Sequence, residues 1–121
     1  MPAQGPVVGL VSFTDPRDTA FALRRERYIE SCHKTLKRAL QKRGVRVVDP
    51  QLKLRRGWKQ VFGIRRPDEV EQCLTILQAG GAQALVLGCW HWTEPMLPLS
   101  LTRDLQRPIA LYAEDDPAWA G

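Results

Sequence analysis

Cysteine and long hydrophobic runs are scarce in this chain of 121 residues. Its three cysteines, Cys32, Cys73 and Cys89, are an odd number with no CxxC spacing, which argues against a disulfide scaffold and against a zinc site. No apolar stretch approaches the ~20 residues that a membrane helix needs. Residues 1–6 carry no basic segment of the kind that begins a secretory signal. These absences predict a cytoplasmic protein with reduced thiols and no membrane segment.

Glycine motifs that cradle phosphates are also missing. No G-x-G-x-x-G follows the first apolar run, so a dinucleotide has no glycine turn to lie against, and no G-x-x-x-x-G-K-[ST] occurs anywhere. The hydroxyls of Ser12, Thr14 and Thr19 match a flavin-phosphate loop only faintly. Asp15 and Asp18 would repel a phosphate there. The motifs therefore indicate no nucleotide cofactor.

The composition is that of an ordinary globular protein, with 44% hydrophobic and 26% charged residues. A length of 121 residues fits a single domain. Short apolar segments alternate with longer amphipathic ones. We expect strands at 7–13, 45–48, 84–88 and 109–113, and helices at 19–43, 67–79 and 98–105. Strands that alternate with helices imply right-handed crossovers, so the predicted fold class is α/β with a four-stranded parallel sheet.

Two further expectations concern the segments between these strands. In the first helix the spacing of apolar residues predicts one buried stripe, made by Phe21, Tyr28, Cys32, Leu36 and Ala39 or Leu40. Segment 51–66 has no clear period, and we expect a long loop with at most a short helical turn. It carries Trp58 and Phe62 among basic residues. Since aromatic residues beside arginines are common interface anchors, we expect this loop to contact a partner subunit or domain.

Charge is distributed unevenly along the chain. Residues 17–66 contain 16 Lys and Arg and four acids, a net +12, whereas residues 67–121 contain two and eight, a net −6. Such asymmetry can mark a surface for nucleic acid or another anion. Helical spacing explains many of the positive charges as a solvated helix face, which we favour over nucleic-acid binding. His33, within this basic helix, is expected to be structural or solvated.

Arg17 is the first candidate binding residue, because it follows the first strand at the edge where parallel sheets hold their ligands. Its guanidinium offers five donors in a fixed fork, suited to carboxylate, phosphate or sugar hydroxyls. A surface ion pair with Asp15 or Asp18 explains the arginine about equally well.

The segment 88–96 is the richest in chemistry. Trp90, His91 and Trp92 follow directly on a buried strand, and tryptophan is rare on a loop unless something covers it. An indole ring can stack on the C–H face of a sugar while polar neighbours bind its hydroxyls. For each ring, packing against neighbouring loops is slightly the better-supported alternative. The pair Cys89 and His91, with or without Glu94, is only a weak signal for a nucleophile or a metal site.

Three segments of this sequence resemble the N-terminal domain of the L-fucose/L-arabinose isomerase family. They are Val7 to Arg17, Leu87 to Met96 and Tyr112 to Gly121, and their order and spacing match over nearly the whole chain. The most specific is the Gly88-Cys89-Trp90 segment with its continuation to Met96. The resemblance implies a Rossmann-like, flavodoxin-type three-layer sandwich with strand order 2-1-3-4. It also implies aldose–ketose isomerisation of an open-chain sugar, assisted by a divalent metal, usually manganese.

The resemblance carries only a supporting role over to this chain. In the family, the Glu, Asp and His that hold the metal lie in later domains, and nothing here matches them, so no catalytic and no metal-binding residue is expected. An arginine after the first strand and a tryptophan after a later strand help to hold the sugar in a neighbouring subunit's site. The matching positions are Arg17 and Trp90, which His91 and Trp92 flank.

We therefore expect the substrate-facing and assembly domain of a sugar isomerase, inactive by itself. Family enzymes are several times longer, so the chain is expected to be a fragment with partner subunits and further domains. The alternatives are a stand-alone, non-catalytic sugar-binding or regulatory module and, less favoured, a nucleic-acid-binding protein that uses the basic region 24–66.

Overall fold

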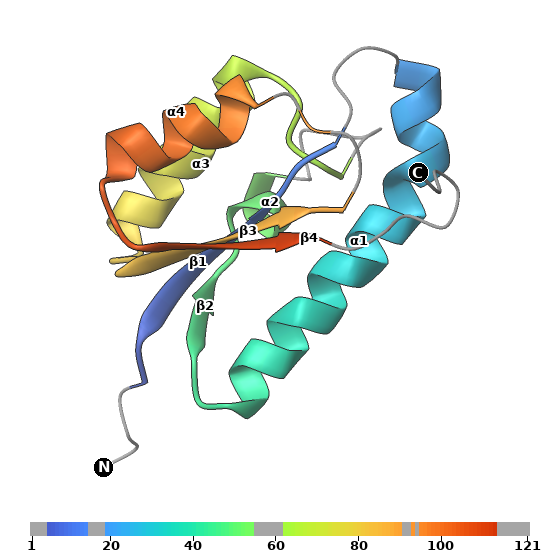
Figure 1. The fold of residues 1–121 in the computed structure, drawn as a ribbon. Coiled ribbons are helices and arrows are strands. Elements are labelled where there is room, and N and C mark those ends of the chain that lie inside the picture. Colours follow the sequence, from blue (N-terminus) through green and yellow to red (C-terminus); the bar gives the residue numbers. More distant parts are fainter. Residues whose placement is uncertain (1–4, 15–18, 55–61, 91–92, 94, 114–121) are drawn as a thin grey trace.

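The computed structural model describes residues 5–14, 19–54, 62–90, 93 and 95–113, with the backbone alone for 19–25. Its centre is a sheet of four parallel strands in the order β2-β1-β3-β4 (Figure 1). The strands are β1 (Val7–Ser12), β2 (Arg46–Val48), β3 (Ala84–Cys89) and β4 (Ile109–Ala113). This confirms the predicted α/β class, the Rossmann-like, flavodoxin-type arrangement and the strand order.

The helices cover both faces of the sheet and complete three layers (Figure 1). On one face α1 (Thr19–Lys42) runs beside β1 and β2, and on the other face lie α3 (Pro67–Ala79) and α4 (Met96–Leu105). The short α2 (Pro50–Leu54) contacts β1 and α3. All six residues of β1 are buried, as expected for a central strand covered on both faces.

Local chemistry explains where these helices begin and end. Gly44 and Gly81 follow α1 and α3 with φ of +82° and +72°, a conformation that glycine adopts without strain. Pro67 opens α3, where its missing N–H is not needed. The buried Glu69 accepts hydrogen bonds from the backbone N–H of Arg65 at 2.8 Å and Arg66 at 3.0 Å, which satisfies donors before the first turn.

The larger hydrophobic core lies between the sheet and the pair α3 and α4. Leu77 of α3, Leu101 of α4 and Leu85 of β3 are each at most 1% exposed within it. Gly9 of β1 lies directly under Leu77 and Leu85, where a Cβ would collide with both side chains. A second, smaller cluster on the α1 side contains Ile29, Phe62 and Trp90.

The expected stripe of α1 is confirmed in part. Tyr28, Cys32 and Leu36 are half-buried against the smaller core cluster, and of the two alternatives at its end Leu40 is half-buried and Ala39 exposed. The side chain of Phe21 lies outside the described residues. The fully buried residues, Ile29 and His33, each lie one position beyond a stripe residue. The centre of the buried face is therefore displaced by one residue, which turns the helix by about 100°. The apolar count missed it because one of the two central residues is a histidine.

The short helical turn allowed for in segment 51–66 is present as α2, which starts one residue earlier, at Pro50. Later in the same segment Ile64 forms a bridge with Phe13. Phe62 is 1% exposed, so its ring belongs to this chain's own core and is not an interface anchor. Trp58 lies outside the described residues. The last helix starts at Met96, two residues before the expected Pro98.

Among the described residues, no helix is long and apolar enough to cross a membrane.

Substitution of Leu77 tests the placement of the larger core. Leu77→Ala should lower the free energy of unfolding by roughly 2–5 kcal/mol, because the side chain is fully buried and its loss leaves a cavity. Leu52→Ala is the matched control, because Leu52 is 43% exposed on α2, and it should change that energy by no more than about 0.5 kcal/mol. Urea denaturation followed by circular dichroism measures both. Equal losses in the two variants would contradict the assignment.

Candidate functional site

The strand order changes direction between β1 and β3. From β1 the chain passes to β2 on one side, and it then crosses over to β3 on the other side. In open parallel sheets, ligands bind outside the carboxyl ends of the strands at such a point. Here those ends are adjacent, because Ser12 of β1 pairs with Gly88 of β3.

A chain of buried hydrogen bonds ties this edge together. The indole Nε1 of Trp90 donates to Ser12 Oγ at 2.9 Å, and Ser12 Oγ lies 2.7 Å from His33 Nδ1. On the other side of the imidazole, His33 Nε2 lies 2.9 Å from Asp49 Oδ2, and Lys37 Nζ donates to the same oxygen at 3.2 Å. We refer to these five residues as the Ser12 network. It joins β1, α1, the end of β2 and the end of β3.

Counting donors gives this network a direction. An indole N–H only donates, so Ser12 Oγ accepts from Trp90 and still has one proton and one lone pair for its contact with His33 Nδ1. On the other side of the ring an ionised Asp49 can only accept, so His33 Nε2 donates to Asp49 Oδ2. His33 thus bridges a buried hydroxyl and a buried carboxylate.

Asp49 is held in its ionised form. Burial alone would raise the pKa of its carboxyl group, but the hydrogen bond from His33 and the charges of His33 and Lys37 together lower the pKa below its ordinary value of 3.8. Asp49 also precedes α2, and its Oδ1 accepts a hydrogen bond from the backbone N–H of Leu52 at 3.4 Å. The carboxylate thus caps a helix and anchors an imidazole at once.

Serine, histidine and aspartate in a row also make up the catalytic set of serine hydrolases. Here, however, Ser12 and His33 are both 0% exposed, and the serine hydroxyl is occupied by the Trp90 indole. A nucleophile must be reachable by its substrate. The Ser12 network is therefore a support beneath the edge of the sheet, and it presents no attacking group.

Gln51 fixes the neighbouring segment to the same edge. Its Oε1 accepts a hydrogen bond from the Ser12 backbone N–H, and its Nε2 donates to the carbonyl of Phe62, both at 2.6 Å. The Phe62 ring meets the His33 imidazole edge-on, with centroids 4.8 Å apart and planes at 72°. Residues on both sides of 55–61 are thus packed beneath β1.

The Trp90 ring is buried, with 2% of the residue exposed. It packs with Ile29 and Phe62, and it lies tilted against Tyr112 of β4 with centroids 5.1 Å apart. Gly88 makes this possible, because a Cβ there would collide with the indole and with Ser12 Oγ. This is the packed arrangement that the sequence left open as the alternative to a free stacking surface.

Four of the other sequence-predicted site residues, Arg17, His91, Trp92 and Glu94, lie outside the described residues. Cys89 is half-buried, and burial raises the pKa of its thiol although a hydrogen bond involving Thr93 opposes the rise. Burial likewise raises the pKa of Cys73 to about 12. In the described part of the chain, no three His, Cys, Asp or Glu side chains come together as a metal site.

Thr14 carries an unpaired hydrogen-bonding group at this edge. Its residue is 0% exposed, and its Oγ1 has no hydrogen-bond partner. The backbone N–H of Thr14 donates to the carbonyl of Ile64 at 3.0 Å, and its side chain lies against Gly63. An unpaired buried hydroxyl is costly, so it calls for a ligand or water as partner.

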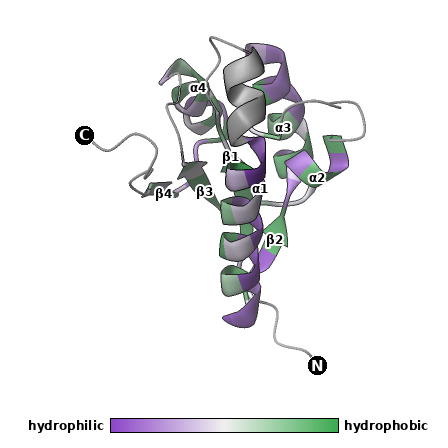
Figure 2. Ribbon diagram, turned by 90° about the vertical axis from the view of Figure 1, so that its right-hand side faces the viewer, coloured by the Kyte–Doolittle hydropathy of each residue, from purple (hydrophilic) through white to green (hydrophobic). Residues whose placement is uncertain are grey.

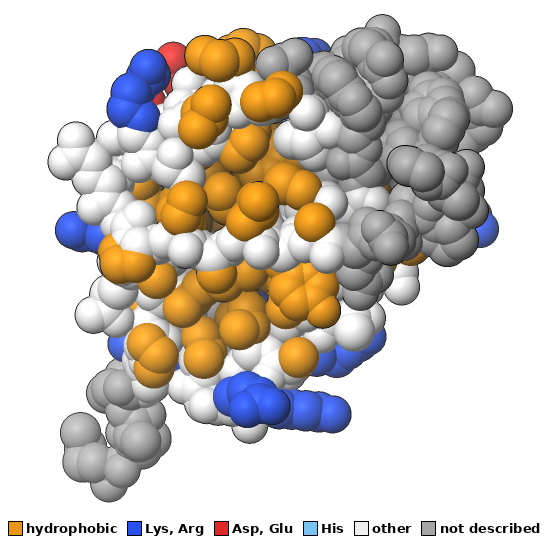
Figure 3. Space-filling view, viewed as in Figure 1, with side chains coloured by type: hydrophobic (Ala, Val, Ile, Leu, Met, Phe, Trp, Pro, Cys, Tyr) orange, Lys and Arg blue, Asp and Glu red, His pale blue; other side chains and the backbone are white. Residues whose placement is uncertain are grey.

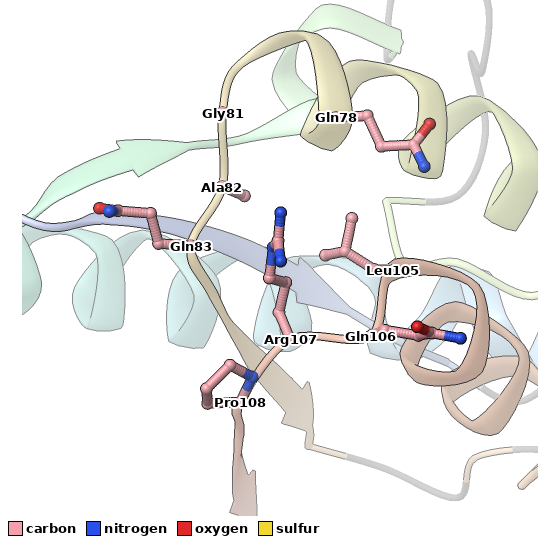
Figure 4. A pocket seen from close by; sticks show the side chains of 8 residues that line it. All are labelled: Gln78, Gly81, Ala82, Gln83, Leu105, Gln106, Arg107 and Pro108. Carbon is pink, nitrogen blue, oxygen red and sulfur yellow. The ribbon is translucent and has the colours of Figure 1, made fainter.

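Two other surfaces carry less chemistry. Hydrophilic residues recur along α1 (Figure 2), where Arg27, Lys34 and Arg38 line a shallow depression and Lys34 pairs with Glu30 at 3.0 Å. This is the solvated helix face expected from the charge pattern. A hollow of ≈ 540 Å³ lies between the end of α3, the end of α4 and the starts of β3 and β4 (Figure 4). It is at the amino ends of the strands, opposite the edge where ligands of such sheets bind.

Comparison with known proteins adds no relative to this picture: no family model, no curated protein and no solved structure matches the chain.

Sequence reasoning found only part of the centre of the site. The expectation that His33 is structural is confirmed, but Asp49 and Gln51 were assigned no role in a site. The available signal was weak, because His33 is 21 positions from Ser12 and 16 from Asp49, and Gln51 is 39 positions from Ser12. Only a histidine at helical spacing from Ile29 marked the buried face.

Asp49→Asn tests the charge in the Ser12 network. Because the folded pKa of Asp49 is lowered, its carboxylate stabilises the protein above the unfolded value near 3.8, and this stabilisation is lost as the pH falls through the lower folded value. The variant should lose roughly 1–3 kcal/mol of unfolding free energy at neutral pH. On acidification its unfolding free energy should then fall by less than that of wild type. Urea denaturation across pH measures this. Asp104→Asn, which alters an exposed ion pair with Arg103, is the control, and identical acid profiles for Asp49→Asn and wild type would contradict the assignment.

Proposed function

We propose that this chain is the N-terminal, substrate-facing and assembly domain of an aldose–ketose isomerase of the L-fucose/L-arabinose type, without catalysis of its own. The observation that carries the proposal is the buried Ser12 network, which ties the carboxyl ends of β1 and β3 at the position where such sheets hold ligands. The segments that resemble the family, Val7–Arg17 and Leu87–Met96, run through these two strand ends.

In this proposal Arg17 donates hydrogen bonds to sugar hydroxyls, and His91 and Trp92 flank the sugar. Trp90 contributes to this site without contacting the sugar. Its buried indole, hydrogen-bonded to Ser12, fixes the direction in which the chain leaves β3, and thereby the start of the segment that carries His91 and Trp92. Trp90 is thus a positioning residue within the proposed substrate site.

Thr14 supplies a specific reason to propose a polyhydroxy ligand. Its buried Oγ1 lacks a partner and lies one residue beyond the bridge between Phe13 and Ile64 at the end of β1. Because Thr14 is 0% exposed, the proposal requires the residues that cover it to move aside when the sugar binds. A sugar hydroxyl both donates and accepts, so it then satisfies this group whichever way the threonine hydroxyl points. The open-chain form of an aldose or ketose presents several such hydroxyls in a row.

The manganese that the resemblance implies does not fit the described residues of this chain, which bring no three ligating side chains together. In the proposed assembly the metal and the groups that move protons therefore come from other domains or a neighbouring subunit. This chain holds and orients the sugar.

Thr14→Val tests the substrate role, because valine keeps the shape and removes only the hydroxyl. Since that hydroxyl makes no hydrogen bond inside the chain, the free energy of unfolding should stay the same or rise. The dissociation constant for L-fucose, L-arabinose or their alditols, measured by NMR titration, should rise by roughly 2- to 10-fold, as for one lost hydrogen bond. Thr75→Val, on the exposed face of α3, is the control. If none of these ligands shifts amide signals of residues 12–14 or 88–90, the proposal is wrong.

A second measurement separates the proposed domain from an enzyme in its own right. The purified chain with added manganese should not interconvert L-fucose or L-arabinose with their ketoses. Polarisation of the sugar by a metal needs a set of metal-binding side chains, and nothing in this sequence matches the set of the family. Turnover that a chelator abolishes would contradict the non-catalytic role. Sugar binding without turnover fits the domain, and it equally fits the alternative of a stand-alone sugar-binding module.

A further inference from the structure

Strand β4 forms an open edge of the sheet. Among the described residues it has a neighbour only on the β3 side, and all five of its residues are exposed. The backbone N–H of Leu85 donates to the carbonyl of Pro108, and backbone groups alternate in direction along a parallel strand. The N–H and C=O groups of Ile109, Leu111 and Ala113 therefore point away from the sheet and are available to another strand.

The surface around this edge is apolar. Leu111 is 65% exposed and Ile109 53%, and Leu99 and Met96 of α4 are exposed to a similar extent. Between them lies a hollow of ≈ 380 Å³ with a largely apolar lining. Figure 3 shows the hydrophobic side chains gathered over α4 and β4, with Lys and Arg side chains at the margins. We refer to these four residues with the strand itself as the β4–α4 surface.

Edge strands of monomeric proteins normally carry protection against pairing, in the form of charged residues, proline or a bulge. The sequence of β4, Ile-Ala-Leu-Tyr-Ala, contains none of the first two, and its pairing with β3 runs in continuous register from Ile109 to Ala113. An unprotected strand beside a contiguous apolar patch marks an interaction site. The backbone groups require the occupant to be a β-strand.

The distribution of charge is compatible with a second copy as the occupant. The β4–α4 surface carries no charge, so two copies can meet there without repulsion although the chain has a net charge of +5. Exposed Arg107 precedes β4. Antiparallel pairing places the Arg107 residues of the two copies at opposite ends of the shared ladder, whereas parallel pairing would place these like charges side by side.

We propose that two copies of this chain associate through β4, antiparallel, across a two-fold axis perpendicular to the sheet. Leu111, the middle residue of the strand, then lies opposite Leu111 of the second copy, and Ile109 lies opposite Ala113. Both pairs join residues whose backbone groups point outward, as an antiparallel ladder requires. The axis keeps the same faces together, so the exposed side chains of α4 extend the apolar contact. This proposal specifies the assembly role given under the proposed function. It rests on that function only for the biological purpose of the dimer.

Sedimentation equilibrium of the chain over a range of concentrations, without sugar, tests this contact. Wild type should be a dimer. Leu111→Lys places two ammonium groups opposite each other and should raise the dimer dissociation constant by roughly thirtyfold or more, as expected for a central apolar contact. Its circular dichroism should be unchanged, because the side chain is exposed. Leu52→Lys, also an exposed leucine but on α2, is the control and should remain a dimer.

A charge-pair experiment tests the symmetry itself. Leu111→Glu and Leu111→Lys should each be monomeric, and an equimolar mixture should form a heterodimer, because the axis sets residue 111 against its counterpart. A monomeric wild type, a Leu111→Lys variant that associates like wild type, or a mixture that stays monomeric would each overturn the proposal. None of these results depends on sugar binding, so this proposal and the proposed function fail separately.

Discussion

An imidazole buried between a hydroxyl and a carboxylate is the interaction on which the carboxyl-end edge of the sheet depends. His33 is hydrogen-bonded to Ser12 through Nδ1 and to Asp49 through Nε2, and each partner belongs to a different segment of the chain. A buried polar group that loses its partner costs roughly 1–3 kcal/mol. The positions of β1, α1 and the end of β2 are therefore mutually dependent, and so is the Trp90 ring that hydrogen-bonds to the same serine.

This constraint fixes the buried residues beneath the carboxyl-end edge of the sheet. Ser12, Gln51 and Trp90 are all buried, and their hydrogen bonds leave the hydroxyl of Thr14 as the buried side-chain polar atom without a partner among the described residues. Buried hydrogen bonds of this kind suit a site whose reacting groups come from other domains or subunits, because they position segments of the chain without supplying a nucleophile or a metal ligand. The proposed role of holding and orienting a sugar follows from that division.

Strands β1 and β4 are both apolar but differ in how far their residues are exposed. The central strand β1 is buried along its whole length, whereas β4 is exposed along its whole length although it is equally apolar. Apolar side chains and unpaired backbone groups at one edge favour coverage by another strand. The chain thus combines a closed, hydrogen-bonded edge at the carboxyl ends with an open, hydrophobic edge beside β4.

Much of the architecture was predictable because its causes are local. Alternation of short apolar runs with amphipathic segments, Gly44 and Gly81 after two helices and Pro67 at the start of another indicate the elements, and right-handed crossovers then lead to a parallel sheet. The parallel sheet and its ligand-side edge followed from these patterns, which use residues only a few positions apart. The flavodoxin-type sandwich and its strand order were instead implied by the resemblance to the isomerase family.

The site was decided by contacts between residues far apart in the sequence. Whether Cys32 or His33 faces the sheet depends on a rotation of α1 by about 100°, which its packing against β1 and β2 sets. Whether Trp90 points outward or inward depends on the missing Cβ of Gly88 and on a hydroxyl 78 positions away. The sequence by itself determined the elements and their order, since local periodicity and turn chemistry suffice for them. Only the tertiary structure decided which polar groups are buried together, because a buried hydrogen bond is favourable only when both of its partners arrive at the same place.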